Sequence, residues 1–274
     1  MFQLKHESTM HFEGNLHKMP AALGEPINYQ LNLDKPILIN ELIGEHISLS
    51  FEGRINCIAC GRLTKKAFGQ GFCYPCFQNS PMNAECIIRP ELCRGHLGEG
   101  RDPEWEQKHH VQPHVVYLAL TSALKVGITR DTQLPTRWID QGAWKTIVLA
   151  RTNNRFECGM IEVALKNHMG DKTPWQRMLK NECNTSIDLV EQKKLAASLV
   201  PDEFQKFINQ EDEVLELHYP VTEYPTKVKS LNFDKTPEIS GKLMGIRGQY
   251  LLFEGGMVLN IRKFSGYYVG ISVA

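Results

Sequence analysis

Two Cys-x2-Cys pairs, Cys57/Cys60 and Cys73/Cys76, constrain the fold of this chain more than any other feature. Each pair is typical of a tight turn that presents two thiolates, and two such pairs complete a tetrahedral Zn2+ site. Gly61 suits the turn after Cys60. Four thiolates leave no coordination position open for substrate, so the pattern predicts a structural zinc ribbon. Metal binding there contributes on the order of 10–16 kcal/mol to folding.

A second group of ligand-type residues follows, with Cys86, Cys93 and His96 in the spacing Cys-x6-Cys-x2-His. His109 or His110 can supply a fourth ligand, and we favour His110 because the strand expected next would fix its position. The sequence therefore predicts a second closed zinc site. The alternative is that Cys86 and Cys93 are core residues and His96 lies in a turn. Cys158 and Cys183 stand alone, and we expect them to be small packed side chains.

Composition and charge indicate the cellular compartment and the kind of partner to expect. Clustered cysteines indicate metal binding rather than disulfides in a cytosolic protein. The N-terminal segment does not resemble a signal peptide, and no run approaches the ~20 apolar residues of a membrane span, so we expect a cytoplasmic protein that does not contact membranes. Lys plus Arg equals Asp plus Glu at 31 each. Residues 111–181 are nevertheless basic, with ten Lys and Arg against five acids, whereas 188–240 hold six against eleven. A basic middle suits a nucleic-acid partner, and ordinary solvated surface is the alternative.

The pattern along the chain predicts an α+β protein. Alternating strands near the N-terminus and Gly-punctuated strands after residue 213 predict a β-barrel or β-sandwich region that both chain ends form together. We expect an N-terminal β region at 1–53, a zinc-binding module at 54–110, an α/β domain at 111–184, a helical connector at 185–212 and a C-terminal β region at 213–274.

Within the α/β domain, 115–120 and 124–129 form a predicted hairpin of two apolar strands. A helix is expected over 134–141, a third strand over 145–151 and an amphipathic helix over 157–169. Thr173 and Pro174 open a further short helix. The predicted order is strand, strand, helix, strand, helix.

Residues 115–165 resemble the GIY-YIG endonuclease family. Val115-Val116-Tyr117 stands where that family has Gly-Ile-Tyr, Lys125-Val126-Gly127 where it has Tyr-Ile-Gly, Arg137 falls on the first helix and Glu162 on the second. The resemblance implies phosphodiester hydrolysis with Mg2+ or Mn2+. Glu162 would bind the metal ion, Arg137 would stabilise the phosphorane-like charge and Tyr117 would align or deprotonate water.

Several positions depart from that family's pattern. Lys125 replaces the second tyrosine and would act electrostatically near the phosphate, with His114 as a candidate proton acceptor, and Gln141 stands where many members have histidine. Asn181 or Asn184 is the candidate for the asparagine near the end of the domain. Taken one at a time, Tyr117, Arg137 and Glu162 are also ordinary strand and helix residues.

The whole chain also resembles an uncharacterised bacterial zinc-ribbon family known only as a domain of unknown function. That resemblance implies the zinc ligands and a nuclease-like core, and no activity. We therefore expect a zinc-containing protein that binds DNA or RNA, with metal-dependent cleavage as the sharper hypothesis. A non-catalytic scaffold that binds a protein or ribonucleoprotein is the alternative. Arg62, Lys65, Lys66, Phe68, Phe72 and Tyr74 either contact nucleic acid or, for the aromatic residues, form the small core of the ribbon.

Overall fold

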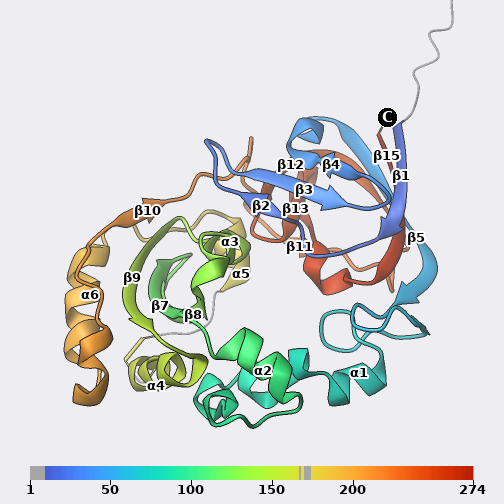
Figure 1. Ribbon diagram of the computed structural model, residues 1–274. Coiled ribbons are helices and arrows are strands. Elements are labelled where there is room, and N and C mark those ends of the chain that lie inside the picture. Colours follow the sequence, from blue (N-terminus) through green and yellow to red (C-terminus); the bar gives the residue numbers. More distant parts are fainter. Residues whose placement is uncertain (1–9, 167, 170–173, 274) are drawn as a thin grey trace, which may run out of the picture. The chain divides into compact units, whose positions relative to one another are not determined.

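A computed structural model describes residues 10–166, 168–169 and 174–273 of the 274-residue chain. The chain divides into two units. The first runs to Cys76 and resumes at Tyr219, and the second spans Phe77–His218. Figure 1 shows their elements, and each unit is described by itself below.

The first unit contains a large sheet that joins both ends of the chain. Its strand order is β1-β15-β5-β12-β13-β14-β11, with β6 paired to β5. The strands are β1 (Met10–Asn15), β5 (His46–Asn56), β6 (Leu63–Thr64), β11 (Lys229–Ser230), β12 (Glu238–Arg247), β13 (Tyr250–Phe253), β14 (Met257–Asn260) and β15 (Tyr267–Val273). β1 pairs with β15, and β5 lies between β15 and β12, so the chain ends form one β region as predicted.

Of the two predicted architectures, a barrel or a sandwich, the barrel is wrong for the residues that the structure describes. β1 and β11 lie at opposite ends of the strand order and do not pair, so the sheet is open. A separate small sheet contains β2 (Ala21–Ala22), β3 (Asn28–Asn32) and β4 (Pro36–Leu38). Tyr29 and Leu31 alternate inward on β3, which is the period of a strand with one buried face.

The second unit begins with irregular backbone and then forms a four-stranded sheet of order β10-β9-β7-β8. Four single-turn 3-10 helices lie at Pro81–Asn83, Glu85–Ile87, Pro90–Leu92 and Gly95–Leu97. The regular elements are α2 (Pro103–His110), β7 (His114–Leu120), β8 (Leu124–Arg130), α3 (Thr136–Asp140), β9 (Lys145–Thr152), α4 (Arg155–Lys166), α5 (Trp175–Leu179), α6 (Leu189–Ser198) and β10 (Val214–Glu216). α1 (Tyr74–Asn79) spans the boundary between the units.

The predicted order of strand, strand, helix, strand, helix is observed from β7 to α4. β7 is central, with antiparallel partners β8 and β9 on its two sides. β10 adds a fourth strand beside β9. The short helix expected after Pro174 is α5, and Thr173 lies outside the described residues.

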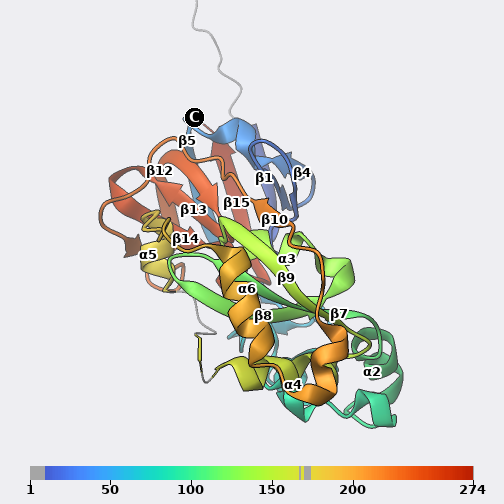
Figure 2. The same ribbon diagram turned by 90° about the vertical axis from the view of Figure 1, so that its left-hand side faces the viewer.

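Alternation along β7 divides the sheet into two different faces. Val116, Leu118 and Leu120 point into a core with Ile161 and Leu165 of α4. α4 and α6 cover this face, as Figure 2 shows from the side. Tyr117 points to the opposite face, where it pairs in register with Gly127 of β8. No helix within the described ranges is long and apolar enough to cross a membrane.

Candidate metal centres and a candidate phosphodiester site

The Sγ atoms of Cys57, Cys60, Cys73 and Cys76 all lie within 4.8 Å of one another. Those of Cys60 and Cys73 are 3.8 Å apart. Sulfurs bound about 2.3 Å from a tetrahedral zinc ion lie about 3.8 Å from each other, which agrees with this spacing. All four cysteines are free thiols. The cluster can hold a metal ion.

Local backbone geometry explains how two distant cysteine pairs converge. β5 and β6 form a hairpin, and the first knuckle turns at its end with Gly61 in the left-handed region at φ +72°. The amide of Gly61 donates to the carbonyl of Cys57 at 2.8 Å. The second pair approaches through Gly71, whose carbonyl accepts from Ile58 N. A side chain at Gly71 would meet the Ser265 carbonyl at 2.6 Å, so only glycine fits there.

The thiols of this cluster ionise unequally without a metal ion. Burial opposes ionisation of Cys57, but hydrogen bonds from the backbone around Cys73, Cys60 and Ala59 outweigh it and hold the pKa of Cys57 at about 6. Hydrogen bonds with the Cys60 and Cys73 side chains instead raise the pKa of Cys76 to about 12. A bound cation would neutralise the negative charge of neighbouring thiolates and so favour ionisation of all four thiols.

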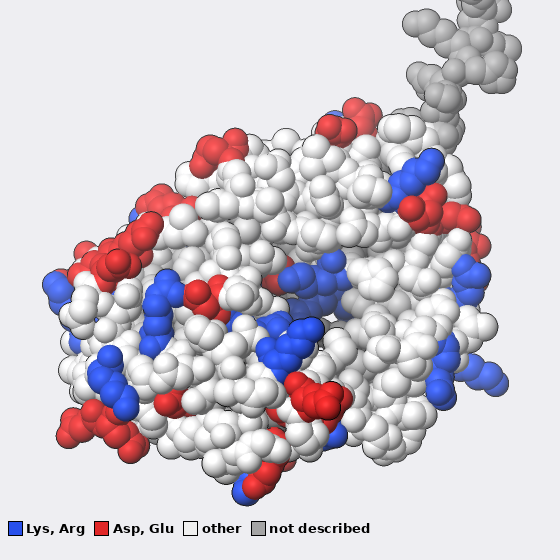
Figure 3. All heavy atoms as spheres, viewed as in Figure 1, with Lys and Arg blue, Asp and Glu red and all other residues white. Residues whose placement is uncertain are grey.

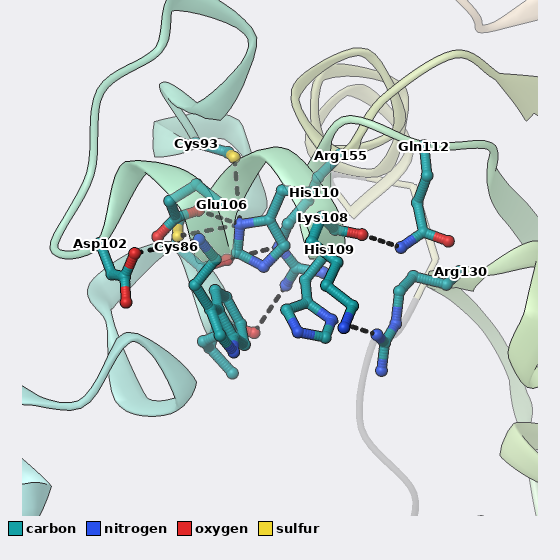
Figure 4. Close-up of polar contacts among 12 residues, drawn as sticks. Cys86, Cys93, Asp102, Glu106, Lys108, His109, His110, Gln112, Arg130 and Arg155 are labelled. Atoms are coloured by element: carbon teal, nitrogen blue, oxygen red, sulfur yellow. Dashed lines mark hydrogen bonds and ion pairs between the residues drawn. The ribbon is translucent and has the colours of Figure 1, made fainter.

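A second cluster contains Cys86, Cys93, Glu106 and His110, whose ligand atoms also lie within 4.8 Å of one another. Figure 4 shows both sulfurs directed at the Nδ1 side of the His110 ring. His110 Nδ1 lies 3.5 Å from Cys93 Sγ and 3.9 Å from Cys86 Sγ, and it directly contacts Glu106 Oε2. The hydrogen bond with Cys86 lowers the pKa of Cys93 to about 4, and the same contact raises the pKa of Cys86.

The structure brings three of the predicted second-site residues together and places His96 elsewhere. The His96 ring stacks on Phe156 with centroids 4.6 Å apart. His109, the alternative to His110, contacts Arg130 through Nδ1 at 2.9 Å. Glu106 is the residue that sequence analysis missed, because acids are common on helices. The signal available for it was its i, i+4 spacing from His110.

Helix α2 explains why Glu106 and His110 face the same point. Asp102 caps the helix by accepting from Trp105 N at 3.0 Å, and Pro103 occupies the first helical position. One turn separates Glu106 from His110, so both point to the same side. Gly100 leaves the space that Glu106 occupies, since a Cβ there would lie 2.4 Å from Glu106 Cγ.

A third group gathers around the hydroxyl of Tyr117, which is 1% exposed. Gln141 Nε2 donates to this hydroxyl, and the Arg137 guanidinium acts on it electrostatically. Burial raises the pKa of Tyr117, while the nearby Arg137 and Gln141 partly oppose the rise. The phenol is therefore a neutral hydrogen-bond donor at neutral pH. Gly127 makes room for it, because a Cβ there would lie 2.6 Å from the hydroxyl.

The remaining candidate catalytic residues are Glu162, Lys125, His114 and Asn181, and their environments differ. Glu162 on α4 is 8% exposed, acts electrostatically on Tyr117 and pairs with Lys166 at 3.3 Å. Lys125 is buried on β8, two residues from Gly127 and on the same face. His114 is fully buried, and burial lowers its pKa to about 4. Asn181 has a left-handed backbone at φ 56°.

The basic character of residues 111–181 is partly neutralised by ion pairs. Arg151 pairs with Asp131, Lys145 with Glu216 at 2.6 Å, and both Arg177 and Lys180 with Glu182. Acidic side chains gather at the upper left of Figure 3, where β10 lies in Figure 1. The surface therefore mixes both signs of charge.

The side chains of the ribbon divide between the two roles considered for them. Phe72 is buried, as a core residue would be, whereas Arg62, Lys65, Lys66 and Tyr74 are exposed. Phe68 is half-buried and contacts Tyr74 at a centroid distance of 5.2 Å. The cations and one aromatic face thus remain accessible.

A family model described as "Protein of unknown function (DUF2797)" matches residues 44–269, well over half of the chain. The match includes every residue of the three groups described above. Comparisons with curated proteins and with solved structures give no match.

Proposed function

Because the chain belongs to the DUF2797 family, whose function is unknown, we propose a function from its own chemistry: a zinc-containing nucleic-acid-binding protein with divalent-metal-dependent endonuclease activity. The single observation that carries this proposal is that Gln141 contacts the buried Tyr117 hydroxyl while the charges of Arg137 and Glu162 both act on it. Strand β7 supplies Tyr117, α3 supplies Arg137, and α4 supplies Glu162, whose charge acts on the phenol. These three residues are among those on which the likeness to GIY-YIG endonucleases rests.

Each side chain has a role that its environment favours. The neutral Tyr117 phenol would donate a hydrogen bond and orient a water or phosphate oxygen rather than act as a phenolate base. The Arg137 guanidinium would stabilise negative charge on the phosphate through hydrogen bonds. Glu162 offers oxygen ligands of the kind that Mg2+ or Mn2+ prefers.

A divalent ion at Glu162 would compete with a cation that already pairs with this carboxylate. Lys166 lies 3.3 Å from the carboxylate, so the ion would have to displace its ammonium group to bind that oxygen. No cluster of three acidic, His or Cys ligands surrounds Glu162 among the described residues. A catalytic ion bound by Glu162 would therefore take its remaining ligands from substrate phosphate and water, as Mg2+ commonly does.

A non-catalytic scaffold is the second candidate, and two observations favour it. Tyr117 is almost fully buried, and much of the basic charge at 111–181 is paired internally. In that case the Tyr117 group would stabilise the fold, and the exposed cations of the ribbon would contact a protein or ribonucleoprotein.

The test is binding and cleavage of single-stranded, duplex and branched DNA and RNA with Mg2+ or Mn2+. Glu162→Gln should abolish cleavage and leave binding intact. Glu191→Gln, an exposed α6 carboxylate that also pairs with a lysine, is the matched control and should change neither. Binding that weakens steeply with salt, without cutting by any variant, would leave only the nucleic-acid-binding part of the proposal. Absence of both would support the scaffold.

A further inference from the structure

The buried carboxylate of Glu106 is the least expected part of the second cluster. Glu106 is 1% exposed, and its Oε1 atom has no hydrogen-bond partner among the described residues. Burying an unpaired carboxylate oxygen beside two thiols is strongly unfavourable in the absence of a cation. Helix α2 holds Glu106 at this buried position, so the structure must contain something that offsets the cost of burying its carboxylate.

We infer that Cys86, Cys93, Glu106 and His110 bind one divalent metal ion, with Glu106 as the fourth ligand, and that this ion holds α4 in place. A tetrahedral zinc site with Zn–S near 2.3 Å and Zn–N near 2.0 Å separates its sulfur and nitrogen ligands by about 3.5 Å. The distances from His110 Nδ1 to Cys93 and Cys86 Sγ, 3.5 and 3.9 Å, agree with that value. Glu106 Oε2 contacts the same nitrogen and would draw back to admit the ion.

Charge balance supports one divalent ion. As metal ligands, two thiolates and one carboxylate would carry three negative charges, and the imidazole would carry none. The ion supplies two positive charges, and the Arg155 guanidinium supplies the third. Arg155 donates from Nε to the carbonyl of Cys86 and from Nη2 to that of Ile87, each at 2.9 Å, so it lies directly beside the cluster. Figure 4 shows it there. Sulfur with nitrogen and one oxygen is a donor set that suits Zn2+.

The same contacts attach the cluster to α4. Arg155 and Phe156 open that helix, and Phe156 packs against Ala84, Cys86 and Cys93. One turn later, Gly159 lies so close to the loop between the two cysteines that a Cβ would sit 2.5 Å from Glu91 N and Pro90 C. Arg155, Gly159 and Glu162 follow at i, i+4 and i+7, on one face of the helix. The metal-bound loop therefore supports the turns of α4 that lead to Glu162.

The assignment of ligands does not depend on the proposed function, and its test uses no activity. Full-length protein stripped of metal would be titrated with Co2+ and then with Zn2+. Thiolate-to-cobalt absorption counts the occupied sites. Tryptophan fluorescence reports the second cluster, because the Trp105 ring lies 5.0 Å from the His110 ring. Glu106→Gln keeps the size of the side chain and removes its charge, and His96→Gln is the matched control.

We expect the wild type and His96→Gln each to bind two ions, and each site to have the same affinity in both proteins. Glu106→Gln should weaken the site reported by Trp105 by more than about 100-fold, beyond the usual effect of losing an outer-shell partner. Weakening by His96→Gln and not by Glu106→Gln would overturn the ligand assignment. A single ion in the wild type, lost in Cys73→Ser and kept in Cys93→Ser, would show that Glu106 and His110 form a metal-free ion pair.

Hydrogen exchange tests the link to α4. Amides of 155–162 should lose protection together with those of 84–97 when the second site is empty. Glu106→Gln empties this site, and Cys93→Ser replaces that variant if it fails to fold. Cys60→Ser, which removes a ligand of the other cluster, should leave α4 protected. Unchanged protection of α4 after loss of the second ion would refute the claim that this ion holds the helix.

Discussion

Replacing Gly159 by alanine tests the close packing of α4 on the loop between Cys86 and Cys93, because the expected change in stability has the opposite sign to that in an ordinary helix. Inside an ordinary helix, alanine is favoured over glycine by about 0.8–1.0 kcal/mol. Here the new methyl would lie 2.5 Å from two backbone atoms and 2.9 Å from Pro90 Cβ. Backbone atoms cannot rotate away, so the loop must shift by about 1 Å. Overpacking of this kind costs about 1–3 kcal/mol, and the upper end applies to backbone contacts. The net result should be destabilisation by about 2 kcal/mol.

Urea unfolding followed by tryptophan fluorescence is the appropriate assay, because all four tryptophans lie between Phe77 and His218. The signal therefore reports that unit alone. Lys194→Ala and Lys194→Gly, at an exposed position on α6, measure the helix propensity difference without overpacking. If Gly159→Ala were as stable as the wild type, or more stable by the propensity difference, the contact between α4 and the loop would not exist as described.

Gly127→Ala should displace the Tyr117 hydroxyl, 2.6 Å from the new Cβ, and lower the free energy of unfolding by about 1–3 kcal/mol in the same urea assay; unchanged stability would contradict the packing. Cys73→Ser should reduce bound zinc from two ions per chain to one in a metal assay, and retention of both ions would refute metal binding by the four-cysteine cluster. Folded His114 has its pKa lowered from 6.5 to about 4, so below pH 6.5 the unfolded chain binds a proton that the folded chain does not. Its contribution is present above that pH and is lost as the pH falls, by up to about 3 kcal/mol. His114→Gln should show a shallower loss of stability between those pH values than the wild type, and an equal slope would refute this origin.

Features encoded within a few residues could be predicted from the sequence, and features that depend on distant packing could not. The Cys-x2-Cys pairs are local, and their convergence followed from chemistry alone. Glu106 shows the limit: its spacing from His110 is visible, but its burial arises only after α2 packs on the cysteine loop. The Cys93 to His96 spacing favoured His96, whereas the 3-10 turn at Gly95–Leu97 directs that ring to Phe156.

Strand partners show the same limit. The short segment Val214–Glu216 has no pattern that selects a partner. Its position in the sequence predicts a place in the C-terminal β region, whereas β10 pairs with β9. The union of both chain ends was predicted from weakly similar stretches, but an open sheet and a closed barrel have the same strand pattern in sequence. Gly159 carries no signal in sequence at all, because its importance lies in the backbone that it approaches.

The position of β5 between β15 and β12 has a consequence for how this protein emerges from the ribosome. Both of these neighbours begin at or after Glu238, so β5 is synthesised roughly 180 residues before either of them. At ~5–20 residues per second it waits about ten seconds or longer with its hydrogen-bonding edges unsatisfied. Residues 77–218 are complete by then. We therefore expect the nascent N-terminal strands to be the segment that chaperones protect, while the inserted unit matures first.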